Sequence, residues 1–500
     1  MNGGYGRMRK RALCAALAVL VTVFPSVRAL ADGPGSSLYD AVSVEGSVSL
    51  NAELLAGVRG PESAAEAVSR QAHSMSDAQK RNPADANQAV LFTEAALAAA
   101  SKKGSEGPYI LLSKGTLEDL ADQAAVVRER VSQSLTESGV AVTRKIANVV
   151  TVETALSAFT LAIHPNILET SAEKIRVTKT TDPGFSLTIR PADLKADFFP
   201  QTAPDGQTPK SEAETPSDKA SPAPEPRILE IRVSMDASEC EPESDAPIPK
   251  VRVDVPDGQL SAPITLSLNP GSREPSALTM EGVAGEYAPA KYNPASRTLD
   301  ASLDASDVYT FGKRNVFFTD LAQKDRKIRA AVEALARVNV VYGYSDNTFR
   351  PEQPVTRAEF VAFVMRAMGR VNNSLKSPFL DVTEGHGCFH EIASAYYYGI
   401  IKGYDENHFC GDRFISKTQI YAILGRILQR EMGYLEIENA SEYLAQEFGD
   451  EISEWARSDI AIATREGLVI RQSNGEFNGD LLMNRGDVAL IIYGLYQRLA

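Results

Sequence analysis

Residues 341–360 read VYGYSDNTFRPEQPVTRAEF, and the same pattern returns at 401–420 and, in weaker form, at 469–488. The loop phenylalanines fall at 349, 409 and 477, and the residues that open the next helix fall at 356, 416 and 484, so both landmarks are 60 and then 68 residues apart. A Phe-x-Asp opens each unit: Phe318/Asp320, Phe379/Asp381 and Phe448/Asp450. This self-similarity indicates three tandem repeats.

The end of each pattern predicts a capped helix. The first two caps are capping boxes and the third is a looser version: Thr356 with Glu359, Ser416 with Gln419, and Asn484 with Asp487. An apolar face follows each cap, as in a helix that packs into a bundle. Each repeat should therefore contribute a helix that begins at a fixed register position.

Capping does not explain the residue directly after each cap, which is Arg357, Lys417 or Arg485. A cation in the first turn of a helix opposes the helix dipole. One interpretation is an anion contact beside the N–H groups of the helix N-terminus, which also favour anions. The other is a salt bridge to a neighbouring acid, such as the aspartate of the opening motif. Both stay open at this point.

Residues 314–500 resemble a set of three S-layer homology repeats. The first repeat carries the Phe-Thr-Asp, Tyr-Gly-Tyr and Thr-Arg-Ala-Glu motifs on which this resemblance rests. We place the repeats at 314–372, 373–440 and 441–500. The resemblance implies an all-α, pseudo-threefold bundle whose grooves bind a secondary cell-wall polysaccharide, often through a terminal pyruvylated sugar. A pyruvate ketal carries a carboxylate, which arginine can bind through two hydrogen bonds.

The resemblance also implies the site residues. The family's arginine maps onto Arg357 and Arg485, with Lys417 as a departure, and its tryptophan maps onto Trp455 alone, because Lys327 and Gly387 hold that place in the other repeats. Its glycine maps onto Gly343 and Gly403, but Arg471 replaces it in the third repeat. We expect one or two working grooves, formed by these residues together with Asp320, Asp381 and Asp450.

The rest of the chain is organised differently. Residues 32–107 are rich in Ala, Ser, Glu and Gln, with one strong helical stretch at 86–100. Short β-branched runs at 108–199 and alternating runs at 228–313 predict two β-rich, sandwich-like domains. The proline-rich stretch 200–227 predicts an extended linker. The fold class is therefore a multidomain α+β protein.

The first 31 residues predict a secretory signal peptide. A basic start, with Arg7 to Arg11, precedes an apolar run from Ala12 to Phe24 and an Ala-x-Ala sequence that ends at Ala31. An uncleaved anchor is the alternative, but the run is short for a membrane span. After cleavage we expect no membrane span and a location in the cell wall or S-layer.

Histidine and cysteine cluster at His386, Cys388, His390, His408 and Cys410. Three interpretations stay open: inert side chains, a disulfide between Cys388 and Cys410, which suits a secreted domain, or a metal site, although the paired spacing of a zinc finger is lacking. We predict no metal and no cofactor.

Composition and motifs narrow the function. The formal net charge of −13 argues against a nucleic-acid partner. Residues 32–313 contain no nucleophile elbow, metalloprotease helix or phosphate loop. We therefore expect a non-enzymatic surface protein, an S-layer subunit or an S-layer-associated protein, that binds acidic wall polysaccharide and can associate with itself or with surface neighbours. The alternative is a wall-anchored enzyme acting on glycan or peptide.

Overall fold

The computed structural model describes residues 48–499, except 52, 106, 182–183, 195–227, 237–248, 255–258, 271–277, 283–286, 289, 294–296, 306 and 374. The predicted signal peptide (1–31) and the predicted linker (200–227) lie outside the described residues. The described residues form two hydrophobic cores, one within residues 58–311 and one within residues 318–496. We call residues 48–313 the body and residues 314–499 the bundle.

The body begins with helices: α1 (Glu53–Ala56), α2 (Pro61–His73), α3 (Asp77–Arg81), α4 (Pro83–Ala100) and, after two short strands, α5 (Lys114–Glu137). The Asn82 side chain caps α4 by accepting from the N–H groups of Ala84 and Asp85. Phe92 and Leu97 of α4 are fully buried. The helical stretch predicted at 86–100 is therefore part of α4, a central core helix.

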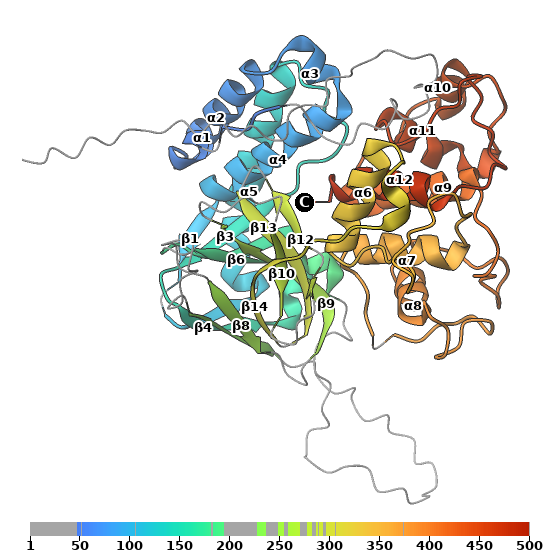
Figure 1. Cartoon of the computed structure of the whole chain (residues 1–500). Helices are drawn as coiled ribbons and strands as arrows, with labels where there is room; N and C mark the ends of the chain where they lie inside the picture. The colour runs from blue at the N-terminus through green and yellow to red at the C-terminus, as the bar shows by residue number, and fades with distance from the viewer. Residues whose placement is uncertain are drawn as a thin grey trace, which may run out of the picture. The chain divides into compact units, whose positions relative to one another are not determined.

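The strands of the body form two seven-stranded sheets among the described residues (Figure 1). The first has the order β1 (Lys102–Gly104), β3 (Val149–Thr154), β5 (Lys174–Lys179), β6 (Phe185–Ile189), β9 (Gln259–Leu268), β13 (Thr298–Ala305), β12 (Ala290–Asn293). The second has the order β11 (Tyr287–Ala288), β10 (Leu278–Glu281), β14 (Asp307–Lys313), β8 (Lys250–Asp254), β7 (Leu229–Asp236), β4 (Ala158–Ile163), β2 (Tyr109–Leu112). The pairs β1/β3, β3/β5 and β2/β4 are parallel, and the other pairs are antiparallel.

The two segments predicted as separate β-domains share both sheets. β4 from the first segment pairs with β7 from the second, and β6 pairs with β9. The rings of Phe159 and Phe185, one from each sheet, stack with centroids 6.1 Å apart. The β-rich, sandwich-like character is as predicted, but the boundary at 200–227 does not separate two folds. Strand periodicity shows which face of a strand is buried, not which strand lies beside it.

The bundle contains the helices α6 (Arg326–Arg337), α7 (Arg357–Ala367), α8 (Phe389–Tyr397), α9 (Lys417–Met432), α10 (Ala440–Glu447), α11 (Arg457–Arg465) and α12 (Arg485–Tyr496), drawn from yellow to red in Figure 1. The helices expected after the three caps are α7, α9 and α12. In the part of the chain that the structure describes, no helix combines the length and apolarity needed to cross a membrane.

Because the body has one core, damage in a late strand should spread to early strands. Leu266 lies fully buried in β9, between β6 and β13. We predict that Leu266→Ala lowers the free energy of unfolding of the body by about 2–5 kcal/mol and reduces hydrogen-exchange protection in β5 and β6 as well as in β9, measured by mass spectrometry. Leu156→Ala, at a half-exposed side chain, is the control. Loss of protection confined to residues 228–313 would contradict the shared core.

Candidate functional site

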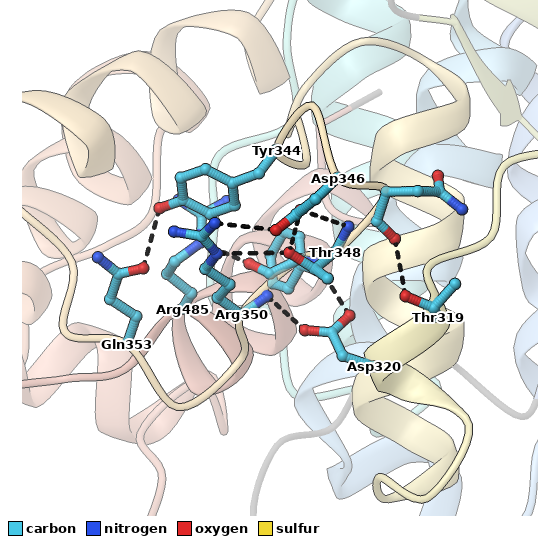
Figure 2. Close-up of polar contacts among 10 residues, drawn as sticks. Thr319, Asp320, Tyr344, Asp346, Thr348, Arg350, Gln353 and Arg485 are labelled. Carbon is cyan, nitrogen blue, oxygen red and sulfur yellow. Dashed lines mark hydrogen bonds and ion pairs between the residues drawn. The ribbon is translucent and has the colours of Figure 1, made fainter.

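The aspartate of each opening motif holds the loop of its own repeat. Asp320 accepts hydrogen bonds from the backbone N–H of Phe349 (2.9 Å) and of Arg350 (2.7 Å), and Figure 2 shows the bond from Arg350. The same pair of bonds joins Asp381 to Phe409 and Cys410, and Asp450 to Phe477 and Asn478. Burial alone would raise the pKa of Asp381, but these N–H groups lower it below its usual value.

These bonds support a strained turn. Arg350, Cys410 and Asn478 all have a positive φ, of 57°, 56° and 52°, a conformation that is unusual for residues other than glycine. A carboxylate that binds two consecutive N–H groups compensates for this conformation. The three aspartates predicted as binding residues are therefore loop supports in this structure, and a ligand contact by any of them stays a prediction.

The predicted glycines make room for the opening phenylalanine. A Cβ added to Gly343 would lie 2.2 Å from Cε1 of Phe318, and one added to Gly403 would lie 2.7 Å from Cε1 of Phe379. In the third repeat the guanidinium of Arg471 lies instead over the ring of Phe448, 5.3 Å from its centroid. Glycine at this turn is thus a packing requirement in the first two repeats.

The helix starts join the repeats in a closed ring. All three predicted caps are present, with Thr356, Ser416 and Asn484 each accepting from the N–H three residues later. The backbone N–H of the residue directly after each cap donates to a loop of another repeat. Arg357 donates to the Arg413 carbonyl, Lys417 to the Leu481 carbonyl and Arg485 to the Gln353 carbonyl, at 2.8–2.9 Å. The first repeat contacts the second, the second contacts the third, and the third returns to the first.

The cationic side chains follow the same ring. Arg357 Nε donates to the Phe409 carbonyl (3.2 Å), Lys417 Nζ to that of Ile470 (2.8 Å) and Arg485 Nε to that of Phe349 (2.9 Å). Each charge also lies 4.6–4.9 Å from the ring centroid of the loop phenylalanine in that neighbouring repeat, a favourable cation–π arrangement. Their exposed fractions are 8%, 1% and 3%. All three cations therefore tie neighbouring repeats together.

The sequence left open a salt bridge between these cations and a neighbouring acid, such as the opening aspartate. The structure has such an ion pair for Arg485, but with a glutamate. No direct ion pair joins any of the three to an opening aspartate within the described residues, whereas Arg485 Nη1 binds Glu359 Oε1 at 2.9 Å. Arg485 also donates from Nη2 to the Tyr342 carbonyl at 2.8 Å. Arg485 therefore binds two parts of the first repeat, its turn and its helix α7.

A pocket of about 200 Å³ lies beside Arg485. Its lining comes from all three repeats: Tyr342, Gly343, Tyr344, Glu359, Ala362, Phe363 and Arg366 from the first, Cys388 from the second and Arg485 from the third. The Arg485 guanidinium lies 5.2 Å from the centroid of the Tyr344 ring (Figure 2). The Arg366 guanidinium lies 4.8 Å from the centroid of the Tyr342 ring and forms an ion pair with Glu391 of α8. The pocket thus combines two guanidinium groups with aromatic rings.

The pair Arg366–Glu391 joins the first repeat to the second, which we call the first boundary. The equivalent positions between the second and third repeats (the second boundary) and between the third and first repeats (the third boundary) differ. At the second boundary, Arg426 and Asp459 form the pair that corresponds to Arg366 and Glu391, but Lys402 and Ile423 replace Tyr342 and Phe363. At the third boundary, Gly494 and Ala331 occupy the places of the ion pair. Trp455 lies on the short 3₁₀ helix Glu454–Ala456 and is 59% exposed. Trp455 does not line the pocket.

Both predicted disulfide partners are free thiols in this structure, so the Cys388–Cys410 bond is not formed. Cys388 lines the pocket, and burial raises the pKa of its thiol to about 11. Among the described residues no group of three or more His, Cys, Asp or Glu side chains could hold a metal ion.

The family comparison matches the repeats directly. The S-layer homology domain model matches residues 317–361, 378–419 and 448–489. The chain carries three S-layer homology domains. Each match lies within one of the repeats read from the sequence, including the third, whose motif is the most altered.

Curated relatives are similar to part of this chain. It is 31% identical over 215 residues to an amylopullulanase of Thermoanaerobacterium thermosulfurigenes, which is 43% of this chain and 11% of the relative. It is 31% identical over 188 residues to exoglucanase XynX of Acetivibrio thermocellus (37% and 17%). It is 29% identical over 191 residues to a cellulosome-anchoring protein of the same species (37% and 39%). The chain therefore spans well under half of each of these relatives.

The sequence predicts Arg485 and Gly343 as site residues but not the other residues of the pocket. Tyr342 and Tyr344 enter the sequence argument only as part of a repeat motif, and Glu359 only as a capping residue. Arg366 occupies the last turn of α7, where a cation suits the helix dipole and needs no further explanation. The recurrence of arginine at 366 and 426 in the repeat register was the available signal.

Lys417 gives a pH test of the ring. Burial lowers its pKa to about 8, although Asp450 and Asp487 act in the opposite direction. Between pH 8 and the usual lysine pKa of about 10.5, the unfolded chain binds more protons at this residue than the folded chain, so stability rises with pH. We predict that wild type gains free energy of unfolding over this range relative to Lys417→Met, in urea titrations at several pH values. Lys402→Met, at an exposed lysine, should run parallel to wild type. A Lys417→Met curve parallel to wild type would contradict a buried ammonium group.

Proposed function

We propose that this chain is a non-enzymatic cell-surface protein, part of an S-layer or associated with one, held to acidic cell-wall polysaccharide by its three S-layer homology domains. The family match and the relative named as a cellulosome-anchoring protein support anchoring at the surface. We also infer that the bundle has approximate three-fold symmetry, since the ring of backbone bonds repeats at equivalent positions.

The pocket beside Arg485 is the observation that carries the proposal. An acidic saccharide offers a carboxylate for a guanidinium group and an apolar ring face for an aromatic side chain. Arg366 and Arg485 supply guanidinium groups, which pair with Glu391 and Glu359, and Tyr342 and Tyr344 supply the aromatic surface. A terminal pyruvylated sugar has both features. The tyrosines and the arginines therefore suit the two ends of one ligand.

We propose that this pocket is the principal binding groove. The second boundary retains an arginine–carboxylate pair but not the same tyrosine and phenylalanine, and the third lacks the pair as well as the turn glycine. One full set of residues in three places favours one strong site, in line with the one or two working grooves expected from the sequence.

The ring contacts change what mutation of its cations should do. Arg357 and Arg485 tie repeats through buried contacts, so alanine at both positions should destabilise the bundle. Such a variant cannot separate binding from folding. Arg366 is a better probe, because it lines the pocket and its ion-pair partner Glu391 can be replaced by a neutral residue at the same time.

The binding test compares two matched double variants of the full chain. We predict that Arg366→Gln with Glu391→Gln reduces retention on purified wall sacculi at least tenfold, because the pocket loses a guanidinium while no buried carboxylate is left unpaired. Arg426→Gln with Asp459→Asn removes the equivalent pair at the second boundary and should bind like wild type. Both should keep the wild-type far-UV circular dichroism spectrum. Equal retention of wild type and the Arg366/Glu391 variant would refute this assignment of the groove.

A wall-anchored enzyme is the second candidate. The names of two relatives, an amylopullulanase and an exoglucanase, favour it, and the body would then carry the activity. Release of reducing sugars from wall glycan, starch or cellulose by the purified full chain would support this candidate. Its absence on all three substrates would count against a glycan-degrading enzyme.

A further inference from the structure

The capped helix of each repeat (α7, α9 and α12), here called its long helix, has two functional ends. Their N-termini form the ring of repeat contacts. Beyond their C-termini, at residues 370, 434 and 496–499, side chains and backbone groups bind the body. These contacts are independent of any ligand.

The segment after α9 pairs with the body as a short β-bridge. The N–H of Lys145 donates to the Gly433 carbonyl (3.0 Å), and the N–H of Leu435 donates to that of Thr143 (2.9 Å). Gly433 has a φ of 72° and ends the helix in the left-handed conformation that glycine adopts readily. The chain therefore turns at Gly433 and pairs directly with residues 143–145.

Between these bonds lies a buried polar contact. Tyr434, which is 2% exposed, donates its hydroxyl to Oδ1 of Asn87 in α4, at 3.2 Å. Asn87 is also 2% exposed. If the bundle left the body, both groups would lose this partner and a buried surface would be uncovered. Such a contact is characteristic of a permanent interface.

Arg370, three residues after the end of α7, forms a buried ion pair with the body. Arg370 Nη2 binds both carboxylate oxygens of Asp193, at 2.7 and 2.8 Å, and Nη1 binds Glu431 of α9. Arg370 is 6% exposed. Its register equivalent in the second repeat, Arg430, is exposed and donates to the Gly399 carbonyl within the bundle. Of these two arginines, Arg370 binds the body and Arg430 binds within the bundle.

The end of α12 completes the contact. The Tyr496 hydroxyl donates to the Ala290 carbonyl. Lys291 Nζ donates to the carbonyls of Gln497 (2.7 Å) and Leu499 (2.6 Å), and a cation at a helix C-terminus is favoured by the helix dipole. All three repeats therefore contribute a contact at the same end of their long helix.

We propose that the anchor of this protein is not a tethered module but a docked one: the C-terminal ends of α7, α9 and α12 seat permanently on the body, and the two unfold as a unit. Each helix start then lies one helix length away from the docked end. Every copy bound to the wall would present its body in the same orientation, with the ring end of the bundle left open.

The test uses the full-length chain and a matched pair of variants. Arg370→Glu places a carboxylate against Asp193 and Glu431, whereas Arg430→Glu changes the exposed equivalent. Wild type and Arg430→Glu should unfold in one calorimetric transition. Arg370→Glu should show two transitions and a larger radius of gyration by small-angle X-ray scattering.

A second measurement separates this proposal from the proposed function. Arg370→Glu should keep the far-UV circular dichroism of wild type and its retention on wall sacculi, because Arg370 does not line the pocket. Two well-separated transitions in wild type, or one unchanged transition and an unchanged radius of gyration in Arg370→Glu, would overturn docking. Loss of wall retention in every variant and in wild type would instead overturn the anchoring function and leave docking standing.

Discussion

The bundle depends on the bonds that cross from the start of each long helix to the loop of a neighbouring repeat. A helix N-terminus has N–H groups that no residue within the helix can satisfy. Here the capping side chain accepts from the third N–H of the helix, and carbonyls of another repeat accept from the first two. The cation of the first turn would be unfavourable on an isolated helix, but it reaches a carbonyl and an aromatic ring across the boundary. The helix start therefore becomes a joint between repeats.

This joint also positions the candidate site. Arg485 comes from the third repeat, yet it lies against the turn and the helix of the first. Its guanidinium forms one side of a pocket whose other sides are Tyr342, Tyr344 and Arg366. A repeat on its own could not form this pocket. The proposed binding function therefore requires the ring to be closed.

The repeats, the caps and the loop landmarks could be predicted from the sequence because each depends on residues close together in the chain. The partners of the cations could not. Arg357 binds a carbonyl 52 residues away, and Arg485 binds one 136 residues away, and a periodic pattern carries no information about such a neighbour. The same limit applies to the body, where β6 and β9 were each recognisable as strands but their pairing was not. Tyr342 and Arg366 were missed because a turn and a helix end explain them adequately in isolation.

The three boundaries have similar backbones but different side chains. The ring bonds and the loop aspartates are present in every repeat, whereas the aromatic and charged lining is complete only beside Arg485. The backbone frame holds the repeats together, and we propose that the lining selects the ligand. Isothermal titration calorimetry of the full chain with an acidic wall-polysaccharide fragment tests this most directly. The account predicts one strong site per chain, which is lost when the carboxylate of the fragment is esterified. Three equal sites, or equal affinity for the esterified fragment, would contradict it.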